Sequence, residues 1–159
     1  MAIDYSLEIA TPLPPAEVAH ALKKAAQRNR LLGAAVAPPD LLGDGVLTGH
    51  GTWVHVSANE PEPWDPVLVD LGLASTTTVT FRMGKSDPVH LQQDDVIALT
   101  VALLERVPGD AVLHFQLEVI WLLRRGGRLT ITEQDDWWPP HRLTLLDIPY
   151  RRETHTFAD

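Results

Sequence analysis

The length, composition and charge of the chain already exclude several classes of protein. Its 159 residues are 45% hydrophobic, which is enough for one folded domain spanning residues 1–159 that needs no cofactor. The formal net charge of −8 repels phosphate backbones and anionic lipid headgroups, so we expect neither nucleic acid nor a membrane surface as a direct partner. The absence of cysteine excludes disulfides and thiolate metal sites.

The N-terminal residues indicate a folded strand and not a targeting signal. They alternate between apolar and polar side chains and lack the basic region of a secretory signal. No stretch of the chain approaches the roughly 20 apolar residues of a membrane span. We therefore expect a cytoplasmic protein.

The first two elements follow from hydrophobic spacing. Ile3 to Ile9 has a period of two and predicts a half-buried strand. After a break at Thr11 to Pro15, apolar residues recur every three or four positions and predict a helix from Ala16 to Arg28.

The middle of the chain is less regular. Leu31 to Pro39 is interpreted as a short strand. Val46 to Thr48 and Thr52 to Val56 predict a hairpin that turns at Gly49-His50-Gly51. Ala58 to Ser75 contains several prolines, so we expect a long connection with a short helical turn.

The second half adds one helix and four strands. Thr76 to Arg82 alternates and predicts a strand. Asp87 is a suitable N-cap, and Pro88 a suitable first residue, for a helix that ends near Arg106. Three further strands follow: Ala111 to Phe115, Val119 to Arg125 and Arg128 to Thr132.

This order predicts an α+β fold. We expect a mostly antiparallel sheet with two main helices packed on one of its faces. Trp53 and Trp121 lie within predicted strands, and we assign both to the core.

Residues that could support catalysis or bind a metal do not form a known motif. No serine lies in a Gly-x-Ser-x-Gly turn, and the glycines between Gly43 and Gly51 are not followed by the helix that a phosphate loop requires. His50 and His55 lack a third metal ligand. Other oxygen and nitrogen donors match neither an EF-hand nor a zinc helix: Asp94, Asp95, Glu133, Asp135, Asp136 and His141. We predict a protein without catalytic activity, cofactor or metal.

The charges are unevenly distributed along the sequence. No lysine or arginine lies between Arg30 and Arg82, whereas six acidic residues do: Asp40, Asp44, Glu60, Glu62, Asp65 and Asp70. Such a negative surface would attract and orient a basic partner. The simpler alternative is that the acidic residues only keep the protein soluble.

A candidate binding surface combines acidic and aromatic residues near prolines. Exposed aromatic side chains beside charges are typical of interface anchors, although each tryptophan could instead cover the core. The candidate residues are Trp64, Glu133, Asp135, Asp136, Trp137, Trp138 and His141.

Five segments of the chain together suggest a known family: Val107 to Phe115, Glu118 to Arg124, Trp137 with Pro139-Pro140, the opening Ile3 to Leu7, and Gln92 to Asp95. They resemble the Sit-type immunity family, which is associated with contact-delivered polymorphic toxins of bacteria. The resemblance covers most of the chain. It implies a small cytoplasmic protein that binds and neutralises one cognate toxin without catalysis or a cofactor.

Two other functions stay open from the sequence. The first is a small hydrolase built from carboxylates with His141 or His55, which would need a closed pocket lined by titratable groups. The second is a homo-oligomeric structural module, which would need a flat apolar face or an unblocked edge strand.

Overall fold

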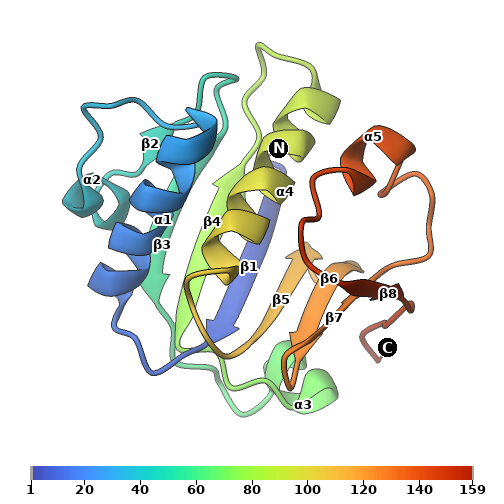
Figure 1. The fold of residues 1–159 in the computed structure, drawn as a ribbon. Helices are drawn as coiled ribbons and strands as arrows, with labels where there is room; N and C mark the ends of the chain where they lie inside the picture. The colour runs from blue at the N-terminus through green and yellow to red at the C-terminus, as the bar shows by residue number, and fades with distance from the viewer. Residues whose placement is uncertain (1, 159) are drawn as a thin grey trace.

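The computed structural model describes residues 2–158 and contains one eight-stranded sheet with strand order β2-β3-β4-β1-β5-β6-β7-β8 (Figure 1). Neighbouring strands are antiparallel except for the parallel pair β7 and β8. The strands are β1 (Asp4–Ala10), β2 (Val46–Leu47), β3 (Trp53–Ala58), β4 (Thr77–Arg82), β5 (Asp110–Phe115), β6 (Val119–Arg125), β7 (Arg128–Ile131) and β8 (Tyr150–Arg152).

The N-terminal strand β1 lies inside the sheet, between β4 and β5. Leu7 is paired with Val79 on one side and with Leu113 on the other, and all three side chains are fully buried. Alternation along β1 directs Tyr5, Leu7 and Ile9 to the helix-covered face. The predicted first strand is therefore confirmed.

Two long helices cover one face of the sheet, as the fold prediction requires (Figure 1). The helices are α1 (Pro15–Asn29), α2 (Pro38–Leu42), α3 (Pro66–Leu71), α4 (Val89–Leu104) and α5 (Pro140–Leu143). Nine residues of α4 are buried, because the sheet, α1 and the segment after α5 all pack against this helix. Among residues 2–158, no helix has the length and apolar character needed to cross a bilayer.

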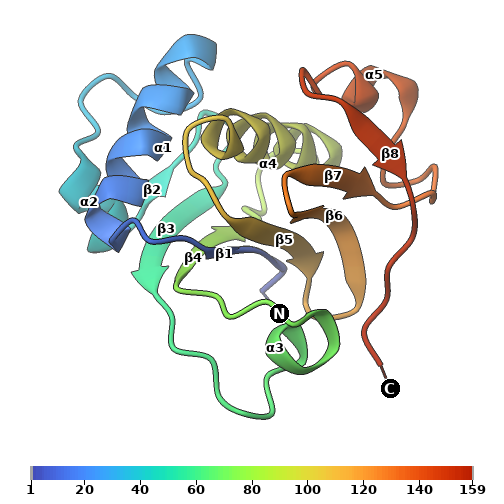
Figure 2. The same cartoon turned by 60° about the horizontal axis from the view of Figure 1, so that its bottom comes forward.

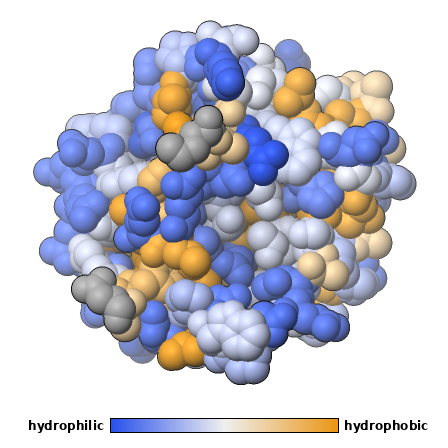
Figure 3. Space-filling view, turned by 180° about the vertical axis from the view of Figure 1, so that it is seen from behind, coloured by the Kyte–Doolittle hydropathy of each residue, from blue (hydrophilic) through white to orange (hydrophobic). Residues whose placement is uncertain are grey.

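The short helix α3 packs on the other face of the sheet. Figure 2 shows α4 and α3 on opposite sides of β5 and β6. Val67 and Leu71 of α3 form a second core with three sheet residues, Val112, Ile120 and Leu123, and with Leu73. Among residues 2–158, the rest of this face mixes hydrophilic and hydrophobic side chains (Figure 3).

Trp53 lies on this second face, so its assignment to the core was wrong. The register of β3 turns Val54 and Val56 inward and Trp53 outward, where its ring stacks on His55 with 5.2 Å between centroids. Trp53 Nε1 donates to the Asp44 carbonyl at 2.8 Å, and the Arg82 guanidinium lies over the ring. Trp121, in contrast, is fully buried as predicted.

The connection between α4 and β5 is held by Arg124 and depends on one glycine. The Arg124 guanidinium donates hydrogen bonds to the carbonyls of Leu104, Val107 and Gly109. It thereby supplies donors to carbonyl groups at and just beyond the C-terminal end of α4. Gly109 has φ 111°, and a Cβ there would lie 1.9 Å from the Ala10 carbonyl oxygen. No other residue fits this position.

Two local predictions were wrong for identifiable reasons. Leu31 to Pro39 contains no strand; the prolines instead begin helix α2, and Asp40 accepts the Ala37 amide at 2.9 Å. Asp87 does not cap α4, which has Pro88 as its N-cap residue without a side-chain hydrogen bond. The Asp87 carboxylate lies 2.8 Å from His50 Nδ1 instead.

The chain after β7 forms elements that the sequence reading did not include, α5 and β8. Trp138, proposed as a surface residue, is only 1% exposed and belongs to the main core. Trp137 is half-buried and packs against the same core. Pro139 and Pro140 start α5 and turn the chain so that Trp138 points inward.

We predict that Trp138→Ala lowers the free energy of unfolding by about 3–5 kcal/mol, because it leaves a large cavity in the core. Trp64→Ala provides the control, since Trp64 is 73% exposed, and should change stability by no more than about 0.5 kcal/mol. Urea denaturation followed by far-UV circular dichroism measures both variants. Equal losses in the two would contradict the assignment of Trp138 to the core.

Candidate partner-binding site

The loop between β7 and α5 presents three carboxylates to solvent. Glu133, Asp135 and Asp136 are all exposed. Glu133 is fixed to the C-terminal segment, because its carboxylate accepts the Thr154 amide at 3.1 Å and its own amide donates to Thr154 Oγ1 at 3.0 Å. Asp135 approaches Arg152 at 3.5 Å but its side chain stays 91% exposed. We call Glu133 to Asp136 the acidic loop.

A rigid aromatic cluster supports the end of the acidic loop. The Trp137 ring lies 5.1 Å from Trp121 and 6.1 Å from Tyr5, measured between centroids. Trp121 Nε1 donates to the Trp137 carbonyl, and Trp138 Nε1 donates to the Trp121 carbonyl, each at 3.2 Å. Both indole N–H groups are therefore satisfied inside the protein. Trp137 and Trp138 act as a platform for the loop.

Helix α5 is fastened to α4 by a buried arginine. Arg142 is 2% exposed, and its Nε donates to Asp94 Oδ1 at 2.7 Å. Its other nitrogens donate to the carbonyls of Trp137 and His90 and to the Gln93 side chain. The guanidinium also lies 5.6 Å from the centroid of the Trp121 ring. Arg142 thus compensates its own burial with several partners.

His141 is exposed beside this anchor. Its Nε2 lies 3.2 Å from Asp94 Oδ2, so His141 and Arg142 both contact the same carboxylate. The surface position of His141 was predicted from the sequence, but its partner on α4 was not.

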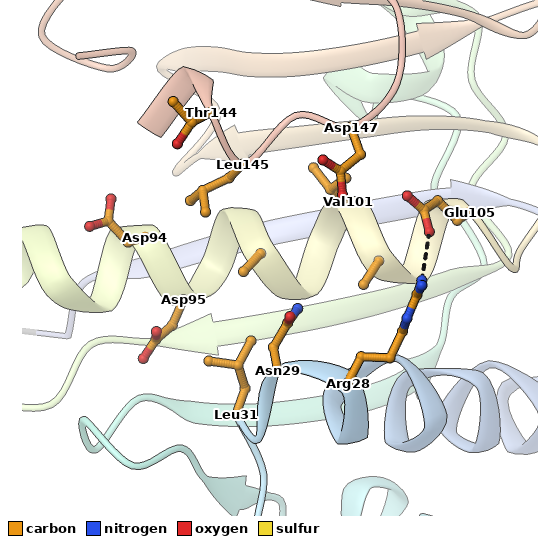
Figure 4. A pocket seen from close by; sticks show the side chains of 12 residues that line it. Arg28, Asn29, Leu31, Asp94, Asp95, Val101, Glu105, Thr144, Leu145 and Asp147 are labelled. Atoms are coloured by element: carbon orange, nitrogen blue, oxygen red, sulfur yellow. Dashed lines mark ion pairs between the residues drawn. The ribbon is translucent and has the colours of Figure 1, made fainter. Parts of the chain in front are cut away.

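A groove of about 530 Å³ lies between α1, α4 and the segment that follows α5. In Figure 4, Arg28, Asn29 and Leu31 lie on one side of α4, and Thr144, Leu145 and Asp147 lie on the other. Four carboxylates and one arginine line the groove: Asp94, Asp95, Glu105, Asp147 and Arg28. We call this cavity the α5 groove. Its excess of carboxylates favours a positively charged ligand.

The acidic loop and the α5 groove are joined through α5. The loop leads into the helix at Pro140, and Thr144 directly after the helix begins one wall of the groove. From the sequence, Asp94 and Asp95 were considered only as metal ligands without a matching motif. Glu105 and Asp147 were not predicted as site residues, because nothing in their local sequence shows that α4 and the segment after α5 meet.

Trp64 does not belong to this site. It precedes α3, on the opposite face of the sheet from α5. It lines a separate hollow of about 370 Å³ with Glu62, Asp65 and Leu117. Below it, His114 Nδ1 accepts the Leu117 amide at 3.1 Å, so His114 Nε2 carries the proton and donates to Glu8 at 2.6 Å. We call Glu62, Trp64, Asp65 and Leu117 the Trp64 patch.

His50 lies near the start of α4 and is linked to the groove by charge. The hydrogen bond to Asp87, with the nearby charge of Asp95, raises the pKa of His50. His55 stacks on Trp53 on the outer face, so the two histidines do not converge. Within residues 2–158, no three potential ligands lie close enough together to hold a metal ion.

Comparison with known proteins identifies one family. The family model described as SitI3-like matches residues 3–142. No curated protein and no solved structure matches the chain. The match includes the sheet through β7, both long helices and the acidic loop, and it ends at the Arg142 anchor.

We expect Arg142→Ala to lower the free energy of unfolding by about 3–5 kcal/mol, because it leaves Asp94 and several carbonyls without their donor. Arg151→Ala is the matched control, since Arg151 is exposed, and should cost no more than about 0.5 kcal/mol. Urea titration monitored by tryptophan fluorescence gives both values. A loss below about 1 kcal/mol for Arg142→Ala would show that α5 is held by other contacts.

Replacing Asp87 by asparagine should lower the pKa of His50, because the hydrogen bond to Asp87 is the largest cause of its rise. A histidine whose pKa is higher in the folded state than in the unfolded state stabilises the fold when it is protonated. This contribution is complete below the unfolded-state pKa, near 6.5, and is lost as the pH rises through the folded-state pKa. The stability difference between wild type and Asp87→Asn should therefore be larger at about pH 5.5 than at about pH 8.5. Histidine NMR titration and denaturation at both pH values measure the two effects, and an unchanged His50 titration would contradict the pairing.

Proposed function

Because the chain belongs to the SitI3-like family, we propose that it is an immunity protein that binds and neutralises one cognate toxin and catalyses no reaction. The observation that carries this proposal is the family match over residues 3–142. From the net charge of −8 we further propose that the toxin surface bound by this protein is basic. We place this action in the cytoplasm.

The toxin is proposed to bind around α5. Here the acidic loop offers three exposed carboxylates on a base packed around Trp137 and Trp138. On the other side of the helix, four further carboxylates line the α5 groove, two of them paired with arginines. A rigid charged surface loses little conformational entropy on binding. His141 lies between the two acidic groups and can contact a partner directly.

A basic toxin surface would fit a toxin that acts on nucleic acid, since such an active cleft must attract phosphates. An acidic protein seated in that cleft would compete with the substrate for the same positive charges. Neutralisation would then need only occupation of the cleft.

The two alternatives receive less support. For a hydrolase, the carboxylate that His141 contacts is Asp94, and Asp94 is already committed to Arg142 and the packing of α5. For a homo-oligomeric module, the edge strands are short: β2 has two residues and β8 has three. Short edges offer little backbone for pairing with a second sheet.

Co-expression tests the proposed function. The candidate toxin is sought among the products of genes that neighbour the gene of this chain. It is expected to kill or arrest cells alone, and co-expression of the chain should restore growth. A folding-deficient chain carrying Trp138→Ala and Arg142→Ala together is the negative control. Failure of the wild-type chain to restore growth would overturn the immunity proposal.

Association kinetics with the purified toxin test the docking surface. Raising NaCl from about 0.1 M to about 1 M should slow association roughly tenfold or more, because salt screens the attraction. Asp135→Lys with Asp136→Lys should slow it further, with little change in dissociation. The control Asp44→Lys with Glu60→Lys makes the same charge change away from α5 and should have a smaller effect. Salt-independent association would exclude electrostatic steering, and equal effects of the two double variants would exclude α5 as its centre.

A further inference from the structure

One carboxylate in the α5 groove differs from its neighbours. Asp94 is paired with Arg142 at 2.7 Å, and Glu105 with Arg28 at 3.7 Å. Asp95 is 9% exposed, and its Oδ2 atom is buried without a hydrogen-bond donor from residues 2–158. A buried charged oxygen without a donor is costly, so proteins rarely retain one without a use.

The surroundings of Asp95 increase this cost. Its desolvation, with a smaller contribution from the adjacent Asp94, raises the pKa of Asp95, while the charge of His50 opposes the rise. A cation placed against Asp95 would restore the interactions that the carboxylate lost on leaving water.

The shape of the groove suits a long side chain with a charged end. Asp95 lies at one end of the groove, and the Arg28–Glu105 ion pair lies at the other (Figure 4). Between them, Leu31, Val101 and Leu145 contribute apolar walls. Lysine and arginine combine a hydrocarbon stem with a cationic head and so match both features.

We propose that the α5 groove binds a lysine or arginine side chain of a protein partner, with its cation at Asp95 and its stem against Leu31 and Leu145. This inference rests on the proposed function, because the partner is then the toxin. It adds a recognition pocket to the acidic loop: the loop would attract the toxin, and the groove would hold one of its basic side chains.

Titration of the free protein tests the pocket without the toxin. The probes are n-butylguanidinium and n-butylammonium, which reproduce the two side-chain ends, with 1-butanol as the neutral control. Amide NMR should show saturable shifts at Asp95 and Leu145 with the two cations and none with 1-butanol. Asp95→Asn should weaken cation binding by about fivefold, whereas Asp44→Asn should not. Amide shifts that do not saturate, or cation binding by Asp95→Asn as tight as that of the wild type, would overturn the proposed pocket.

The folded state of Asp95→Asn provides an independent check. Since Asp95 has a buried oxygen without a donor, removing its charge should leave the melting temperature unchanged or higher at about pH 8.5, where His50 no longer carries a positive charge that attracts Asp95. A lower melting temperature would show that Asp95 has a structural partner and would overturn the inference.

Dissociation of the toxin complex then identifies the occupant. Asp95→Asn should speed dissociation about tenfold or more and change association little, because a buried charge contact acts after docking. If the free protein binds the cations but Asp95→Asn leaves the dissociation rate of the toxin unchanged, the toxin does not occupy the groove. The proposed immunity function would not be affected by that result. Failure of the proposed function itself appears separately, as failure of the wild-type chain to restore growth.

Discussion

The contact between Arg142 and Asp94 is the constraint on which the acidic surface depends. It connects α5, which lies beyond the last hairpin, to the N-terminal half of the core helix α4, with 2.7 Å between Arg142 Nε and Asp94 Oδ1. This contact fixes the position of α5 and, with it, the end of the acidic loop and the first residue of the groove wall. Arg142 also donates a hydrogen bond to the Trp137 carbonyl. Breaking a buried ion pair of this kind is costly, because one charge is left without its partner, so the pair holds α5 in one geometry. Here that geometry is the arrangement of negative charge.

The sheet and the acidic surface are built by different means. The sheet depends on alternating apolar residues and on pairing between regular strands, and its inner face is continuous from Val54 on β3 to Ile131 on β7. The acidic surface depends on irregular backbone held by particular hydrogen bonds, such as those between Glu133 and Thr154. Substitutions on the exposed acidic loop can therefore change the surface charge while the sheet stays intact.

Sequence patterns predicted the parts of this molecule whose structure is local. The alternation in β1, the helical spacing in α1 and the glycine turn between β6 and β7 each specify an element from adjacent residues. The position of Trp138 was not predictable in this way, because its burial depends on α5 and on a hydrogen bond to Trp121, 17 positions away. Trp53 was misplaced because two apolar neighbours, Val54 and Val56, took the inward positions. Asp94 and Asp147 converge only after α4 and the C-terminal segment have packed together, so the groove has no signature in the sequence.

The central position of β1 has a consequence for how quickly the protein becomes functional. Tyr5 must pair with Phe81 and also with Phe115, which lies 110 positions further along the chain. During synthesis, β1 therefore has no partner on its second side until β5 has left the ribosome. Sheets that depend on such distant pairings fold in milliseconds to seconds, about a thousandfold slower than helical bundles of similar stability. Under the proposed immunity function, protection would depend on molecules that have already folded, and the accumulated pool of the protein would matter more than its rate of synthesis.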